Sequence, residues 1–185
     1  DKLGSTAGAW RNHLLPGLQA LAVPGRQVLA WLQPTQPALF DRERFPVFNL
    51  QVPEGRFYGF PRFSVPGFKF GKYHHLEEQG DAETLSREVT REDERVLREF
   101  AAAYFPEGAG PTMSLKSCLF TNSPDEHFII DVHPEWPQVS LAAGFSGHGF
   151  KFASVIGEIM ADLAIRGMTR HDIALFRLAR FGKLS

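Results

Sequence analysis

Alternation of apolar and polar residues predicts several short strands in the first half of the chain. In residues 26–33, RQVLAWLQ, the apolar side chains of Val28, Ala30 and Leu32 occupy every second position, which is typical of a strand with one buried face. Three aromatic-rich runs follow, with the turns PEG and PRFSVPG between them, at residues 47–52, 56–60 and 67–75. Short strands joined by such turns predict an antiparallel meander.

The clearest helical pattern spans residues 90–106, TREDERVLREFAAAYFP. Thr90 and Asp93 have the spacing of a capping box, acidic residues fill the first turn, and Pro106 ends the helix. The apolar side chains that share one face are Val96, Leu97, Phe100 and Tyr104. This pattern predicts an amphipathic helix that packs against the sheet formed by the preceding strands.

The last third of the chain predicts further strands and a second long helix. Apolar runs at residues 114–122, 127–132 and 138–144 predict the strands. The helix ends at Gly167, and its apolar positions are Phe152, Val155, Ile156, Ile159, Met160 and Leu163. A short helix near the start, interrupted by Pro16 and Gly17, has on one face Trp10, Leu14, Leu15 and Leu18. Together these elements predict an α+β fold with a mostly antiparallel sheet.

The composition excludes several functional classes. The 185 residues, 43% apolar and 22% charged, suit one globular domain or parts of two. The net charge is −1 and the basic residues are dispersed, so we expect neither a nucleic acid nor a membrane as partner. Cys118 is the single cysteine, which prevents a disulfide within the chain and favours a reducing, cytoplasmic location. No metal site is predicted.

A glycine-rich turn, GFSGHGFKF at residues 144–152, separates the last predicted strand from the last predicted helix. Such a turn lets backbone N–H groups converge on an anion or a carbonyl oxygen. The dinucleotide-binding fingerprint does not fit, because Phe152 stands where its third glycine is expected. The alternative is a tight turn in which the glycines serve only the backbone geometry.

Lys151 favours a ligand site at this turn. The sequence places it in the first turn of the predicted helix, where a cation opposes the helix dipole at a cost of about 0.3–1 kcal/mol. A lysine directed at a bound carboxylate offsets that cost, whereas a lysine that swings into solvent avoids it. We therefore expect negative charge to arrive or develop near Lys151.

Several long runs of the sequence point to a known family: KSCLFTNSPDEHFIIDVHP, VSLAAGFSGHGFKFASVIGE and HDIALFRLARF, with shorter runs AGAW, FYGFP and GFKFGKYHH. They closely resemble the C-terminal half of the monomeric sarcosine oxidase family, which includes N-methyltryptophan oxidase and pipecolate oxidase. The similarity covers nearly the whole chain.

The resemblance implies a flavoprotein that oxidises the C–N bond of small secondary amino acids, with FAD as cofactor and O₂ reduced to hydrogen peroxide. It implies that residues 1–25 and 119–185 belong to the FAD-binding domain and that residues 26–118 form the substrate domain. The family's N-terminal GxGxxG portion is absent from this chain, which starts without an initiator Met or a signal peptide. We therefore expect a piece of a longer, monomeric protein.

The resemblance also implies roles for individual residues. Cys118 is expected to bind the 8α carbon of the flavin through sulfur, and Lys69 to activate oxygen beside the flavin ring. Lys151 is expected to pair with the substrate carboxylate, and Tyr58 to line the substrate pocket and take part in catalysis. The residues expected to bind the cofactor at the glycine turn are Gly144, Phe145, Gly147, His148, Gly149 and Lys151.

A histidine shortly after the oxygen-activating lysine is also expected to lie close to the substrate. The run KYHH offers His74 as the catalytic residue and His75 as the alternative. Without the resemblance, the sequence would predict a solvated strand lysine at Lys69, a small buried side chain at Cys118 and part of an aromatic core at Tyr58.

Two other functions remain open at this point. The chain could be a flavin-free module with a binding or structural role, in which case the protein would be colourless. It could instead be part of an amine dehydrogenase that passes electrons to a partner protein rather than to O₂. The implied role of Lys69 favours O₂ as the acceptor.

Overall fold

The computed structural model describes residues 1–10 and 19–182 of the chain and divides it into two compact units. The first unit comprises Asp1–Gly25, Gln79–Thr84 and Phe120–Ser185, and the second comprises Arg26–Glu78 and Leu85–Leu119. Most of the short helix predicted near the start, including Leu14, Leu15 and Leu18, lies outside the described residues. No helix formed by the described residues has the length and apolar character needed to cross a bilayer.

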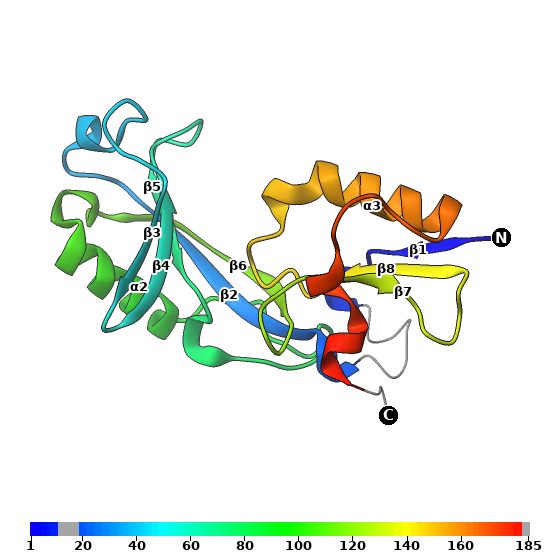
Figure 1. The fold of residues 1–185 in the computed structure, drawn as a ribbon. Coiled ribbons are helices and arrows are strands. Elements are labelled where there is room, and N and C mark those ends of the chain that lie inside the picture. The colour runs from blue at the N-terminus through cyan, green and yellow to red at the C-terminus, as the bar shows by residue number, and fades with distance from the viewer. Residues whose placement is uncertain (11–18, 183–185) are drawn as a thin grey trace. The chain divides into compact units, whose positions relative to one another are not determined.

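The second unit is built on a five-stranded sheet with the order β3-β4-β5-β2-β6 (Figure 1). Its strands are β2 (Val23–Leu32), β3 (Phe48–Val52), β4 (Gly55–Phe60), β5 (Phe68–Lys72) and β6 (Thr112–Asn122). The β3–β4, β4–β5 and β2–β5 pairs are all antiparallel. This arrangement confirms the predicted meander.

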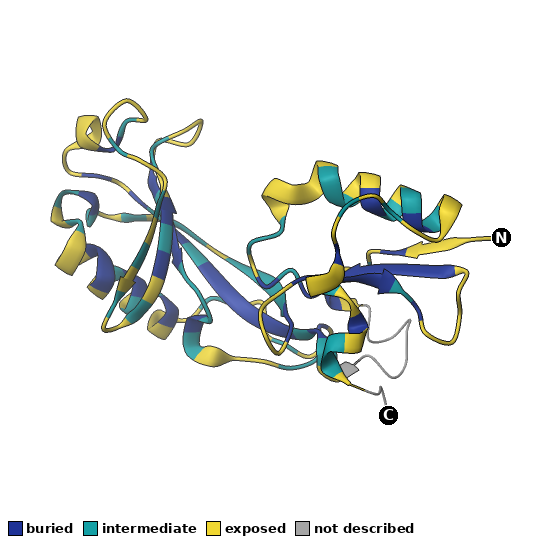
Figure 2. Cartoon of the chain, in the orientation of Figure 1, coloured by how far each residue is buried: buried dark blue, intermediate teal, exposed yellow. Residues whose placement is uncertain are grey.

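Helix α2 (Arg91–Tyr104) covers one face of this sheet and forms the core with it. The rings of Phe57 and Phe100 stack with centroids 3.7 Å apart, while Leu97, Phe68 and Phe70 are fully buried. Each such side chain contributes about 1.5–3 kcal/mol when it leaves water. Figure 2 shows buried positions repeating along α2 and the strands beneath it. The predicted capping box between Thr90 and Asp93 is present.

Strand β5 ends at Lys72, so the prediction of a strand through residue 75 was wrong for its last three residues. His74 adopts a left-handed backbone with φ 52°, and His75–Glu77 form a 3₁₀ turn. This turn carries His75 into the interior, where its side chain is completely buried. The polar partners that His75 meets there explain why the chain leaves the sheet at this point.

The first unit contains a three-stranded sheet with the order β1-β8-β7. Strand β8 (Val139–Ala143) pairs in parallel with β1 (Leu3–Ser5) and antiparallel with β7 (Ile129–Val132). Helix α3 (Ala153–Arg166) packs on one face, where its Leu163 joins Ile130 and Ala142 in a buried cluster. Because a second cluster around Leu141 covers the other face, β8 is buried along its whole length.

The entry into α3 differs from the prediction. Phe150–Phe152 form a separate 3₁₀ turn, and Phe152 is the N-cap of α3. Lys151 therefore lies one residue before the cap and not in the first turn of the helix. The end of α3 agrees with the sequence, because Gly167 takes the left-handed conformation with φ 72° that closes a helix.

Short 3₁₀ turns complete the connections in both units. They are Gly8–Trp10, Gln19–Leu21, Pro37–Phe40, His75–Glu77, Pro106–Gly108, Phe150–Phe152, Ala174–Phe176 and Leu178–Phe181.

Candidate functional site

Lys69 lies on the face of the five-stranded sheet that α2 does not cover. Its neighbours in β5, Phe68 and Phe70, are fully buried beneath α2, and alternation along the strand turns Lys69 the opposite way. The β-sheet register places Lys69 beside Trp31 of β2 and Phe60 of β4. Its Nζ atom is 5.0 Å from the centre of the Trp31 ring and 5.3 Å from that of Phe60. Both distances are within the range of a cation–π interaction.

A pocket of about 290 Å³ opens beside Lys69. Most of its lining is apolar, and the residues that line it include Trp31, Phe60, Phe63, Val65 and Lys69. Phe63 is 73% exposed and Val65 is 47% exposed, so the outer wall offers apolar surface to an incoming group. An apolar hollow with one fixed charged group is the usual form of a small-molecule site.

Tyr58 lies across the same face of the sheet. In the register of β4 and β5 it is opposite Gly71, and a Cβ atom on Gly71 would come within 2.9 Å of the Tyr58 Oη atom. The glycine therefore lets the Tyr58 ring lie over β5, where its centroid is 4.9 Å from that of Tyr73. Burial, and then negative charge on Cys118 or Tyr73, raises the pKa of Tyr58 well above its ordinary range. The phenol stays protonated and can donate a hydrogen bond.

Cys118 is a half-buried thiol in β6 and forms no disulfide. Burial raises the pKa of the thiol, and the positive charges of Arg87 and Lys69 oppose that rise. Since Cys118 also influences the pKa of Tyr58, the structure brings Tyr58, Lys69 and Cys118 into one electrostatic neighbourhood. The nearby cations would favour the thiolate, which is the reactive form of cysteine.

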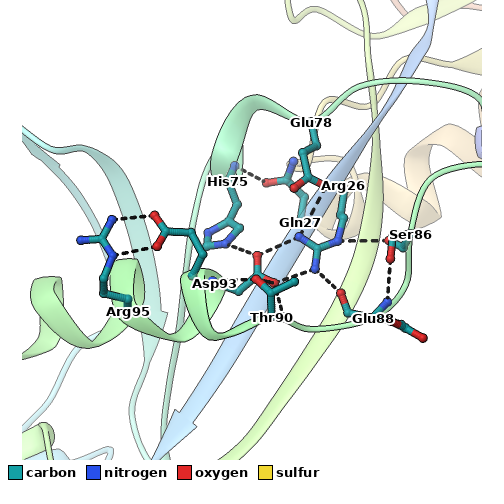
Figure 3. Close-up of polar contacts among 10 residues, drawn as sticks. Arg26, Gln27, His75, Glu78, Ser86, Glu88, Thr90, Asp93 and Arg95 are labelled. Atoms are coloured by element: carbon teal, nitrogen blue, oxygen red, sulfur yellow. Dashed lines mark hydrogen bonds and ion pairs between the residues drawn. The ribbon is translucent and has the colours of Figure 1, made fainter.

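The two adjacent histidines have different environments. His75 is fully buried, and its Nε2 atom lies 2.8 Å from Asp93 Oδ1 (Figure 3). His74 is half-buried at the left-handed turn position that follows Tyr73. Of the two, His74 is the one accessible to a ligand.

The glycine turn belongs to the first unit and is ordered by contacts within that unit. Gly144 and Gly147 have φ angles of 59° and 79°, which L side chains rarely adopt. A Cβ atom on Gly147 would lie 2.3 Å from the ring of Phe120, so no larger residue fits there. Ser146, which is buried, accepts a hydrogen bond from the Ser123 N–H at 3.2 Å and donates to the Gly144 carbonyl at 3.1 Å.

The remaining predicted residues of this turn differ in how firmly they are held. The ring of Phe145 packs 5.0 Å from that of Phe128, and the His148 ring lies 4.9 Å from Phe128 on another side. His148 Nε2 is also 3.0 Å from a backbone carbonyl. Lys151 is exposed, with its Nζ atom 5.3 Å from the centre of the Phe152 ring.

The glycine turn offers backbone hydrogen-bond donors to a ligand. Within the part of the chain that the structure describes, the N–H groups of Gly147 and Gly149 have no hydrogen-bond acceptor. Two such groups on one short turn suit a carbonyl oxygen or an anion. In the same described residues, no three His, Cys, Asp or Glu side chains are arranged to hold a metal ion.

Three residues of the second unit were not identified from the sequence: Trp31, Phe60 and Tyr73. Trp31 lies between Ala30 and Leu32 and so points to the opposite face, and Phe60 lies two residues after Tyr58 and so shares its face. Strand periodicity could therefore have placed each of them. Which strands are neighbours could not be deduced in that way.

Comparison with known proteins identifies the family. A family described as FAD dependent oxidoreductase matches residues 3–163. The chain belongs to this family. Its members depend on FAD, so FAD is the cofactor that the residues above have to fit.

Curated relatives show which members of the family the chain is similar to. The chain is 42% identical to "Monomeric sarcosine oxidase" of Arthrobacter sp. (strain TE1826), over 97% of this chain and 47% of that protein. It is 38% identical to "N-methyl-L-tryptophan oxidase" of Escherichia coli O127:H6, over 95% of this chain and 46% of that protein. The chain therefore spans about half the length of the curated relatives it matches.

Solved structures support the fold. L-proline dehydrogenase from P. horikoshii superposes with a TM-score of 0.77 at 21% identity, covering 98% of this chain and 48% of that one. Amadoriase I from Aspergillus fumigatus superposes with a TM-score of 0.76 at 21% identity, covering 95% and 42%. These similarities confirm the predicted α+β class.

The described residues fit a flavin. Trp31, Phe60 and Tyr58 offer an aromatic face, and Lys69 offers a fixed positive charge within it. The thiol of Cys118 belongs to the same five-stranded sheet. Taken by itself, the first unit offers the N–H groups of Gly147 and Gly149 in its glycine turn. Aromatic surface, one cation and backbone donors are the means by which proteins hold and tune such a ring.

Proposed function

We propose that the protein containing this chain uses FAD to oxidise the C–N bond of small secondary amino acids and reduces O₂ to hydrogen peroxide. The observation that carries the proposal is the position of Lys69, between Trp31 and Phe60 on the uncovered face of the sheet. The identity of 42% to a protein named monomeric sarcosine oxidase supports the substrate class. In this proposal residues 1–25 and 119–185 serve the flavin and residues 26–118 serve the substrate.

Substrate binding would rely on charge and on one phenol. FAD, when bound, supplies the acceptor for two electrons from the amine. Lys151 is exposed and can turn its ammonium group toward the substrate carboxylate. Tyr58 stays protonated and can donate a hydrogen bond, while His74 can accept or hold a proton near the amine.

Lys69 is proposed to promote the reaction with oxygen. Reduction of O₂ builds negative charge, and a cation already fixed in an apolar pocket stabilises that charge without reorganisation. The rings of Trp31 and Phe60 hold the ammonium group in place. The wall of the pocket beside it is mostly apolar.

Cys118 is proposed to tether the flavin through a bond from Sγ to the 8α carbon. Sulfur replaces one hydrogen of the methyl group, and the two electrons released pass to O₂. Burial raises the pKa of the thiol, and the positive charges of Arg87 and Lys69 partly offset that rise and so help to form the thiolate that this bond requires. We also propose that the protein is a cytoplasmic monomer, as its single cysteine and the resemblance suggest.

The test is made on the whole protein. We expect a yellow protein that remains yellow after acid precipitation and that releases hydrogen peroxide with sarcosine but not with glycine. A colourless protein would instead support a binding or structural module. Reduction of the flavin by the amine without reoxidation by O₂ would support a dehydrogenase.

A further inference from the structure

We infer that His75, held by Asp93, is a positioning residue that fixes the turn carrying Tyr73 and His74 against Tyr58. The inference rests on the proposed function, because Tyr58 and His74 belong to the proposed substrate site. His75 itself touches no ligand. It acts by determining where its two preceding neighbours lie.

The side chain and the backbone of His75 are both anchored. Its ring Nε2 lies 2.8 Å from Asp93 Oδ1, and its backbone N–H donates to Gln27 Oε1 at 3.2 Å. All three side chains are buried, with 2% exposure or less. The other ring nitrogen, Nδ1, has no partner among the described residues, so the ring is held through Nε2 alone.

Asp93 is itself immobilised. Arg26 donates to both of its carboxylate oxygens, at 2.8 and 2.7 Å, and Thr90 donates to Oδ2 from its backbone N–H at 2.7 Å and from its hydroxyl at 2.9 Å (Figure 3). Every one of these groups is a donor, which leaves the carboxylate as acceptor. His75 must therefore carry its proton on Nε2, and this selects one tautomer.

Anchoring is needed because the backbone here is unfavourable. His74, Leu76 and Glu77 all have positive φ angles, of 52°, 52° and 55°. Residues other than glycine keep such a conformation only where surrounding contacts impose it. His75 lies between His74 and Leu76, and its bonds to Asp93 and Gln27 are contacts that help to impose it.

The constraint reaches the proposed site within two residues. The N–H of Tyr73 donates to the Arg56 carbonyl at 2.9 Å, which keeps Tyr73 in register with β4. Its ring lies 4.9 Å from that of Tyr58. If the His75 anchor were lost, the turn would relax and both Tyr73 and His74 would shift relative to Tyr58.

The experiment compares His75→Leu, which removes the N–H donor, with His75→Gln, whose amide nitrogen can occupy the position of Nε2. Leu97→Ala is the matched control, because Leu97 is fully buried in the same helix as Asp93 but contacts only the core on the other face of the sheet. We expect His75→Leu to lower kcat at least about ten-fold, and His75→Gln to restore it to within about three-fold. Affinity for a carboxylate inhibitor should change less than about three-fold in both, since His75 makes no contact with the carboxylate.

A second measurement does not depend on activity. ¹⁹F NMR of the whole protein labelled with 3-fluorotyrosine can follow Tyr58 and Tyr73, because comparison with Tyr58→Phe and Tyr73→Phe assigns their two signals among those of all labelled tyrosines. We expect both signals to move in His75→Leu, and to remain near their wild-type positions in His75→Gln and Leu97→Ala.

Each outcome decides the inference. Unmoved tyrosine signals in His75→Leu, or equal effects of the Leu and Gln variants, would overturn it. If His75→Leu does not fold, Gln27→Met, which removes the acceptor of the His75 backbone N–H, takes its place in the comparison with His75→Gln. If the wild-type protein oxidises no amine, the proposed function fails, but the NMR comparison still shows whether His75 positions Tyr73 and Tyr58.

Discussion

Arg26 donates to both carboxylate oxygens of Asp93, at 2.8 and 2.7 Å, and neither side chain is more than 1% exposed. The pair joins β2 to the first turn of α2 across 67 residues of sequence. A charge buried in this way is tolerated only because its partner neutralises it. The stability of the second unit should therefore depend strongly on this one contact.

Asp93→Asn should lower the free energy of unfolding by about 3 kcal/mol, because the buried Arg26 then keeps as counter-charge only the half-exposed Glu78, 3.6 Å away. Urea denaturation measures the change. The matched control is Glu92→Gln, which breaks an exposed pair with Arg95 on the same helix and should have no measurable effect. If both variants lost the same free energy of unfolding, the buried pair would contribute no more to stability than the exposed pair, which would contradict the prediction.

The difference in unfolding free energy between wild type and Asp93→Asn should depend on pH. Burial by itself would raise the pKa of Asp93, but hydrogen bonds from Arg26 and Thr90 hold it well below its usual range. A depressed carboxylate pKa contributes stability that is complete above the unfolded value near about 4 and is lost as the pH falls further. The difference between wild type and Asp93→Asn should shrink below about pH 4.

His75 should make the free energy of unfolding depend on pH in a second, higher pH range. Burial lowers the pKa of its imidazole, although the hydrogen bond to Asp93 opposes the effect. The unfolded chain, in which the histidine titrates near about 6.5, therefore binds a proton that the folded chain does not bind. The free energy of unfolding should decrease as the pH is lowered from about 7 through about 6.5 and toward the depressed value.

The observable is the difference between wild type and His75→Gln in urea denaturation at a series of pH values. The other histidines titrate in both proteins and cancel in this difference. The decrease attributed to His75 should be missing from the variant. Two curves that run parallel between pH values of about 7 and 5 would contradict the assignment.

Cys118 should be the site of covalent flavin attachment. Cys118→Ser in the whole protein should abolish the yellow colour that survives acid precipitation, while the fold is kept, because a hydroxyl occupies nearly the same space as the thiol. Near-native circular dichroism would confirm the fold. Acid-stable flavin in Cys118→Ser would mean that another residue forms the bond.

Lys69 should govern the oxidative half of the proposed reaction. Lys69→Met keeps the length of the side chain but removes the charge between Trp31 and Phe60. Reoxidation of the reduced flavin by O₂ should slow on the order of a hundred- to a thousand-fold, as with loss of one electrostatic donor in other enzymes. Stopped-flow spectroscopy measures the two half-reactions separately. An equal loss in the reduction by substrate would show that Lys69 has a structural role.

Local patterns were enough to predict most elements of the fold. The alternation of Phe68, Lys69 and Phe70 gave the correct buried and open faces of β5, and the spacing of Thr90 and Asp93 gave the start of α2. Both are short-range effects, since the face of a strand and the cap of a helix depend on residues a few positions apart.

Contacts between distant segments could not be predicted. Asp93 reads as a helix cap, and nothing in its surroundings along the chain shows that it also binds Arg26 and His75, 67 and 18 residues away. The same long-range contact takes His75 out of the strand that its sequence suggested. The rings around Lys69 likewise come from β2 and β4, and their meeting depends on strand order and register.

Lys151 is the subject of the last prediction, and its surroundings change the argument from the sequence. It precedes Phe152, the N-cap of α3, in a short 3₁₀ turn, and its side chain is exposed. Among the described residues no carboxylate forms an ion pair with it, and its Nζ atom lies 5.3 Å from the centre of the Phe152 ring. Because Lys151 lies before the first helical turn, the prediction rests on its exposed ammonium group, which can meet an incoming carboxylate, and not on the helix dipole.

Lys151→Met should therefore weaken the binding of carboxylate inhibitors such as small thioether acids roughly ten- to a hundred-fold, the value of a charge-assisted hydrogen bond. A neutral amine that lacks the carboxylate should bind equally well to both proteins. The matched control is Lys2→Met, which removes an exposed positive charge from the same unit without approaching the glycine turn. Inhibitor titration followed by the flavin spectrum measures each affinity in the whole protein. If carboxylate affinity is unchanged in Lys151→Met, the lysine stays in solvent and the glycine turn serves the flavin alone.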